Sequence, residues 1–214
     1  MSDIFSEVDE DVRKDKSLEL WKVYGKYVIG AAVCVVATTA AVVGWNNYQL
    51  TQAQSQGRQM ESASKLVSAT KFAEASEAYA ALAANGSKGY QALARLRQAS
   101  ALIAAGNGTE GVAVYDALAA SDADEEFKAA AKIMAGYYLI DNGTPEQVRA
   151  RVTGVETAGN IWASSAQELL ALSALKEGKK DEAIKILSGL KDDANAVTGV
   201  KARATQLLQA LGEK

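Results

Sequence analysis

The chain has 214 residues, of which 49% are hydrophobic, and a formal net charge of -3. This slightly acidic balance argues against nucleic-acid binding, which requires a basic surface. The absence of histidine excludes the usual zinc ligand and any nucleophile activated by histidine. With one proline, one cysteine and a composition rich in helix-forming residues, the sequence predicts an all-α protein without internal disulfides.

Residues 1–26 form a mixed-charge N-terminal tail. Ile4, Val8 and Val12 recur at intervals of four, which fits a short amphipathic helix that binds a partner or the membrane surface. The mixture of charges favours the simpler interpretation of a solvated tail.

Residues 27–45 read YVIGAAVCVVATTAAVVGW and contain no charge. A helix of about 20 residues, rising about 1.5 Å per residue, crosses a hydrocarbon core of about 30 Å. Trp21 and Tyr24 precede this stretch and Tyr48 follows it, as expected of aromatic belts at the two interfaces. We therefore expect a transmembrane helix at residues 27–45. The alternatives are a buried core helix, disfavoured by apolarity all round the helix, and a signal peptide, disfavoured by the long charged leader.

The tail carries five lysine and arginine residues, whereas the first 20 residues after the apolar stretch carry two. By the positive-inside rule, the N-terminus is expected in the cytoplasm and the body on the far side of the membrane. One face of the predicted span is lined by small residues, which allow close packing of helices in lipid. A partner's helix or a second copy of the chain could dock there, although alanine-rich spans form such rows by chance. This predicted packing face consists of Gly30, Cys34, Thr38 and Ala41.

Residues 46–57 are polar, uncharged and rich in glutamine, which predicts a helical stalk. Residues 58–191 contain a repeat with intervals of 36, 37 and 35 residues, which is typical of a helical array. Each unit is expected to pair two helices, with small residues allowing close approach. The four recurring columns are Ala63, Ala99, Gly136 and Ala171; Ala75, Gly111, Val148 and Ala183; Tyr79, Tyr115, Val152 and Leu187; and Leu82, Leu118, Val155 and Leu190.

Glycines after three of the expected helices predict left-handed turns, at Gly106, Gly143 and Gly178. Thr144 is expected to cap a helix, with Pro145 in its first position. Residues 192–214 carry one apolar stripe and predict a capping helix over the last repeat.

No combination of residues indicates catalysis, and no metal or cofactor site is expected. The acidic cluster Asp122, Asp124, Glu125 and Glu126 precedes an expected helix, where negative charge complements the helix N-terminus. The glycine turns lack the following lysine of a phosphate-binding loop. These observations point away from an enzyme and towards a binding protein.

Helical hairpins of this length, with the small residues Ala63 and Ala75 twelve apart and Tyr79 four residues later, resemble tetratricopeptide repeats. The usual early aromatic residue and the closing proline of each unit are missing, and the third unit is degenerate. The resemblance implies a groove lined by the first helices, with a core role as the alternative for Leu96 and Ile133. The matching groove positions are Met60, Ser64, Leu96, Ser100, Ile133 and Tyr137.

The whole layout, from the acidic start through one span to repeats, is similar to the bacterial ancillary Sec translocon subunit family. This resemblance implies a single-pass inner-membrane protein whose repeats lie in the periplasm. It also implies two partners, the Sec translocon subunits and periplasmic chaperones. The alternatives are a scaffold of another cell-envelope assembly and a signalling protein acting through its cytoplasmic tail.

Overall fold

The computed structural model describes residues 2–157 and 159–213, and side chains for residue 14 and residues 16–157 and 159–213. The described residues form nine α-helices and no strand, which confirms the predicted all-α class. The chain divides into two compact units, residues 1–54 and 55–214. The helices are α1 (Ser2–Ser68), α2 (Phe72–Asn85), α3 (Lys88–Ala104), α4 (Gly108–Ala119), α5 (Glu125–Asn142), α6 (Pro145–Val152), α7 (Ala163–Lys176), α8 (Lys180–Asp192) and α9 (Thr198–Ala210).

The first unit consists of α1 up to residue 54. Its described side chains are exposed, apart from Gly25 beside the Trp21 ring. Among the described residues, α1 is the one helix long and apolar enough to cross a membrane. The hydroxyl of Thr39 donates to the carbonyl of Val35 at 2.8 Å, so this polar group is satisfied within the helix. The side chains of the predicted amphipathic tail, Ile4, Val8 and Val12, lie outside the described residues.

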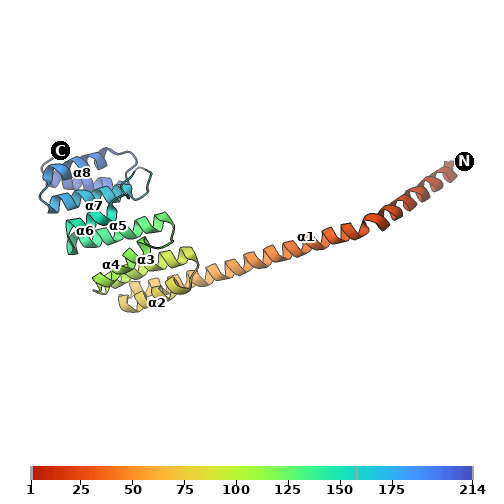
Figure 1. The fold of residues 1–214 in the computed structure, drawn as a ribbon, viewed down its shortest axis with the longest axis horizontal. Helices are drawn as coiled ribbons and strands as arrows, with labels where there is room; N and C mark the ends of the chain where they lie inside the picture. The colour runs from red at the N-terminus through yellow and green to blue at the C-terminus, as the bar shows by residue number, and fades with distance from the viewer. Residues whose placement is uncertain (1, 158, 214) are drawn as a thin grey trace. The chain divides into compact units, whose positions relative to one another are not determined.

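The second unit is an array of helical hairpins (Figure 1). Residues 55–68 of α1 pair with α2, and three further hairpins follow, α3 with α4, α5 with α6, and α7 with α8. Helices α2, α4 and α6 also contact the first helix of the next hairpin, and α8 contacts α9. We call residues 55–68, α3, α5 and α7 the first helices of the four repeats, and α2, α4, α6 and α8 the second helices.

All four predicted columns lie in the core of this array, and each of their sixteen members is buried. The reason for the small residues is visible at Gly111 in α4. A Cβ atom there would lie 2.6 Å from Cγ1 of Ile103 and 2.8 Å from the carbonyl oxygen of Ala99, both in α3. The absence of a side chain therefore allows the two helices of this hairpin to approach closely.

Two of the three predicted glycine turns have the expected conformation. Gly106 (φ 90°) and Gly178 (φ 76°) are left-handed, and the amides that follow bond back into the preceding helix. The prediction is wrong for Gly143, which has an extended backbone (φ -135°) because the chain turns directly into the cap of α6. In the first hairpin the left-handed residue is Thr70 (φ 57°), which the sequence pattern did not indicate.

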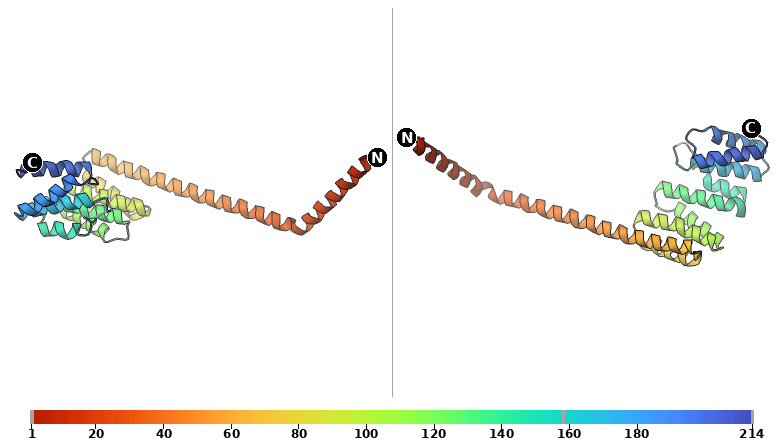
Figure 2. Two further views of the ribbon diagram at one scale, coloured as in Figure 1. Left: turned by 90° about the horizontal axis from the view of Figure 1, so that it is seen from above. Right: turned by 180° about the vertical axis from the view of Figure 1, so that it is seen from behind.

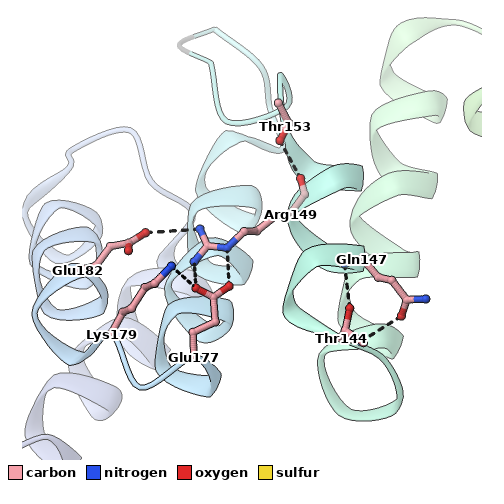
Figure 3. A network of polar contacts seen from close by, with 7 residues as sticks. All are labelled: Thr144, Gln147, Arg149, Thr153, Glu177, Lys179 and Glu182. Atoms are coloured by element: carbon pink, nitrogen blue, oxygen red, sulfur yellow. Dashed lines mark hydrogen bonds and ion pairs between the residues drawn. The ribbon is translucent and has the colours of Figure 1, made fainter.

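The predicted cap of α6 is confirmed (Figure 3). The Gln147 amide donates to Oγ1 of Thr144, and the Thr144 amide donates to the Gln147 side chain, with Pro145 in the first turn. Helix α6 has only 8 residues, compared with 12 to 14 in the other second helices, and a loop leads from it to α7. The third repeat is therefore irregular, although Val148, Val152 and Val155 remain in the core.

Helix α9 lies against α7 and α8 at the C-terminal end of the array (Figure 2). Val200, Ala204 and Leu208 are buried on one stripe, as the spacing predicted. They join Leu187 and Leu190 of α8 in one apolar cluster.

Candidate interaction surface

The first helices and α9 form one side of the array, which we call the first-helix face. Along it, α3 contacts α5, α5 contacts α7, and α7 contacts α9. Arrays of this kind bind other polypeptides on the surface lined by these helices. The residues predicted for the groove all lie on these helices.

In the first two repeats the predicted groove residues form a partly apolar surface. Met60 and Leu96 are half-buried and pack against the core, while Ser64 and Ser100 are exposed. The Ser100 hydroxyl lies 2.7 Å from the phenol oxygen of Tyr115 in the paired helix. Burial raises the pKa of Tyr115, and its hydrogen bond to Ser100 opposes that rise.

In the third repeat the two predicted groove residues differ in exposure. Ile133 is 0% exposed and belongs to the main apolar cluster, as its alternative core role expects. Tyr137 is half-buried, and its hydroxyl donates to Oε2 of Glu168 in α7 at 2.6 Å. Ile133 therefore offers no surface to a partner, and the groove prediction is wrong for it because its side chain fills the core. Contact of a partner with Tyr137 stays a prediction.

Glu168 connects three successive helices of the first-helix face. Its side chain is 2% exposed, and it accepts hydrogen bonds from Tyr137 in α5 and from Arg203 in α9. The guanidinium of Arg203 is bidentate, with Nε and Nη2 each 2.6 Å from a different carboxylate oxygen. Nη2 also lies 3.3 Å from the Tyr137 hydroxyl. We call these three side chains the Glu168 network.

The electrostatics of the Glu168 network keep its donors protonated. Burial, and then the hydrogen bond to Glu168 and its negative charge, raise the pKa of the Tyr137 phenol. The hydrogen bond to Glu168 raises the pKa of Arg203, whose side chain is half-exposed. A neutral phenol and a charged guanidinium therefore satisfy the buried carboxylate together.

Sequence reasoning missed Glu168, although the repeat period carried a signal for it. Counting 36, 37 and 35 residues from Met60 leads to Leu96, Ile133 and Glu168. A carboxylate in a column of three large apolar residues requires a polar partner when buried. The identity of that partner, Arg203, was not indicated because α9 lies outside the period.

The second helices carry ion pairs between neighbouring repeats. Arg151 of α6 makes a bidentate pair with Asp116 of α4, at 2.9 and 2.7 Å. On the other side, Arg149 makes a bidentate pair with Glu177 at 2.9 and 3.0 Å and lies 3.4 Å from Glu182 of α8 (Figure 3). The two arginines of the short α6 thus reach both neighbouring repeats.

Glu177 receives a second cation, because Nζ of Lys179 lies 2.5 Å from Oε2 (Figure 3). The hydrogen bonds from Arg149 and then Lys179 lower the pKa of Glu177 to about 2. This carboxylate is therefore charged at any pH at which the array is expected to work.

In the first unit, all members of the predicted packing face are exposed: Gly30, Cys34, Thr38 and Ala41. A Cβ built on Gly30 has no contact within 4 Å apart from the nearby backbone of α1 and the two adjacent residues, so a second helix backbone can approach closely there. Among the residues whose side chains are described (14, 16–157 and 159–213), no three histidine, cysteine or carboxylate side chains are placed to hold a metal ion.

An all-helical array with a continuous first-helix face defines a helical-repeat protein of the class that binds other proteins. A family profile described as a tetratricopeptide repeat-like domain matches residues 19–186, and the chain belongs to this family. The matched region includes the apolar residues 27–45 and ends within α8. Comparisons with curated proteins and with solved structures give no match.

Proposed function

We propose that the chain is a non-enzymatic interaction protein, anchored in the bacterial inner membrane by residues 27–45. The observation that carries the proposal is the exposed apolar stretch of α1, which lies inside the region matched by the repeat family. An exposed apolar stretch of this length requires either lipid or a partner protein to cover its side chains. A signal sequence shares these properties, so extraction of membranes with alkaline carbonate, with the size of the retained chain measured, tests the anchor.

The excess of lysine and arginine before residue 27 supports a cytoplasmic N-terminus and a periplasmic array. A phosphatase fused to the C-terminus is expected to be active. An inactive but stable fusion would show the opposite orientation.

By its resemblance in layout, the protein is proposed to assist the Sec translocon and to link it to periplasmic chaperones. The small face of Gly30, Cys34 and Thr38 is the proposed contact with a channel helix. The first-helix face is the proposed contact with folding factors, through Met60, Ser64, Leu96, Ser100 and Tyr137, with Ile133 supporting them from the core.

Photocrosslinking in native membranes tests this assignment. A photoreactive residue at Thr38 lies on the small face, whereas the matched control at Val36 points about 160° away from it. We expect channel subunits to be crosslinked at Thr38 and not at Val36. Recovery of cell-wall or outer-membrane assembly proteins at Thr38 would instead identify a scaffold of another assembly. A loss of function on deleting residues 1–20 alone would identify the signalling alternative.

A further inference from the structure

Equivalent pockets lie where consecutive repeats meet. In the second repeat, the start of α3 and the loop from α4 to α5 form a small pocket with Lys88, Arg95 and Ser121 in its lining. In the fourth repeat, the start of α7 and the loop from α8 to α9 form a larger pocket. Six lining positions of the two pockets are related by 72 residues: 88 and 160, 91 and 163, 92 and 164, 95 and 167, 121 and 193, and 123 and 195.

Polar side chains of the chain itself lie at the first two junctions, buried in the first and exposed in the second. In the first repeat, Gln56 is 7% exposed, and its Oε1 accepts from the amide and the hydroxyl of Ser87 at 3.2 and 2.9 Å. In the second repeat, Nζ of Lys88 lies 3.2 Å from Oδ2 of Asp122. This pair is exposed and contributes little to stability. The pair is relevant here because it shows the position of a lysine ammonium group at the junction of the second repeat.

The fourth repeat has no cation in the lining of this junction and has one more carboxylate than the second repeat, although Ala194 stands where the second repeat has Asp122. Asn160 stands where the second repeat has Lys88, and Gln167 stands where it has Arg95. Asp193 replaces Ser121, and Glu156 enters the lining from the preceding loop. The pocket therefore carries two acidic side chains and no basic one among its lining residues.

The carboxylate of Glu156 is incompletely satisfied. Its Oε2 atom is buried, and no hydrogen-bond partner for it exists among the described residues. Asp193 accepts from the amide of Asn195 at 2.8 Å through Oδ1. The nearby ammonium of Lys201 donates to the backbone carbonyl of Asp193 at 2.8 Å and is not part of the lining. A buried carboxylate oxygen without a donor is unfavourable. Glu156 lines the pocket, so a rotation of its carboxylate that turns Oε2 towards a ligand with a donor relieves this cost.

The rim of the pocket adds an apolar contact. Ile161 is 67% exposed, and it lines both this pocket and its neighbour, which includes Glu125 and Glu126. Glu125 is already paired with Lys128 at 2.7 Å. A partner that matches this surface therefore carries a cationic side chain next to an aliphatic one.

We propose that the pocket of the fourth repeat binds a lysine or arginine side chain of a partner protein, at the place that Lys88 takes in the second repeat. Glu156 and Asp193 receive the cation, and Ile161 contacts an aliphatic neighbour in the partner's sequence. The inference rests on the proposed role as an interaction protein and specifies one chemical feature of its partner.

The test is a titration of the full-length protein in detergent micelles, followed by nuclear magnetic resonance of isotope-labelled isoleucine methyl groups. The probe is the peptide acetyl-Ala-Leu-Lys-Leu-Ala-amide, and the matched control carries norleucine, which keeps the aliphatic chain of lysine and lacks its ammonium group. We expect the lysine peptide to shift the Ile161 methyl signal to saturation. The norleucine peptide should bind at least about tenfold more weakly, which corresponds to about 1.4 kcal/mol.

Variants test the assigned residues. Asn160→Lys places the chain's own cation in the pocket, as in the second repeat, and should weaken peptide binding at least about tenfold, or about 1.4 kcal/mol. Glu156→Gln combined with Asp193→Asn should do the same, whereas Lys88→Asn, at the other pocket, should leave binding unchanged. The methyl signals of Ile133 and Ile140, which are buried in the core, report whether each variant is folded.

Equal binding of the two peptides would overturn the proposal, and it needs no variant to fold. Unchanged affinity in folded Asn160→Lys would overturn it as well. The titration contains no channel subunit, so its failure leaves the proposed translocon role untouched. Conversely, a failed crosslinking experiment leaves this pocket assignment intact.

Discussion

The strongest test of the array is the removal of Arg203 from the Glu168 network. Arg203→Met keeps the apolar stem of the side chain and removes both bidentate hydrogen bonds, each 2.6 Å long. The carboxylate of Glu168, 2% exposed, then retains the hydroxyl of Tyr137 as its donor. A buried charge that loses its counterion destabilises the folded state.

The magnitude follows from the exposure of the two partners. Breaking a fully buried pair costs about 3–5 kcal/mol. Because the side chain of Arg203 is 50% exposed, water screens part of this interaction, and we expect a loss of about 2 kcal/mol. For a chain of this size, that loss lowers the melting temperature by about 4–8 °C.

The assay is thermal unfolding of the full-length protein in micelles, followed by circular dichroism, with hydrogen exchange of α9 as a local readout. The compensating variant combines Arg203→Met with Glu168→Leu and Tyr137→Phe. Leucine at position 168 reproduces Leu96, its counterpart in the second repeat. Replacing all polar partners together should restore stability to within about 1 kcal/mol of the native chain.

Two results would refute this reasoning. A loss below about 0.5 kcal/mol for Arg203→Met would mean that the pair behaves like an exposed one. A compensated variant as unstable as Arg203→Met would mean that the lost stability does not come from an unpaired carboxylate.

The remaining predictions concern packing, backbone conformation and pH. Gly111→Ala inserts a methyl group 2.6 Å from an α3 side chain and should destabilise by about 1–3 kcal/mol in thermal unfolding. Gly189→Ala, whose methyl group meets nothing within 4 Å beyond the adjacent residues and the nearby backbone of α8, should stabilise by about 0.5–1 kcal/mol. Thr70→Gly removes the steric strain of a β-branched residue in the left-handed conformation. This gain exceeds the cost of the greater conformational freedom of glycine in the unfolded chain, so stability should rise by about 0.5 kcal/mol. A lower melting temperature would contradict this prediction. The pKa of Glu177 in the folded chain is lowered from 4.5 to about 2, so the stability that its ion pairs contribute is complete above pH 4.5 and is lost as the pH falls towards 2. The difference in melting temperature between the native chain and Arg149→Met should therefore shrink over that range. A difference that stays constant down to pH 2 would refute the pairing.

The all-α class and the hairpin repeat were predictable from local spacing. Residues 27–45 can be recognised without any knowledge of packing as an uncharged stretch long enough for a membrane-spanning helix. The columns headed by Ala63 and Ala75 were also visible, because close helix pairing demands small side chains at fixed intervals. The cap at Thr144 was predictable because its hydrogen bonds join residues only three apart.

The candidate site was predictable only in part. Tyr137 could be placed on the first-helix face by its position in the period. Its hydrogen bond to Glu168 spans 31 residues, and the link from Arg203 to Glu168 spans 35. The left-handed Thr70 was missed because propensity assigns that conformation to glycine, whereas the bonds of the turn impose it here.

The apolar segment, the repeat period and the small-residue columns follow from the sequence alone, because each depends on side-chain volume or polarity at short, regular spacing. The packing of the helices in three dimensions sets which polar side chains meet between repeats. It brought Glu168 to Arg203, and it left the carboxylates of Glu156 and Asp193 in a pocket without a lining cation. Such pairings depend on how neighbouring helices pack across tens of residues, and the spacing within one helix carries no information about them.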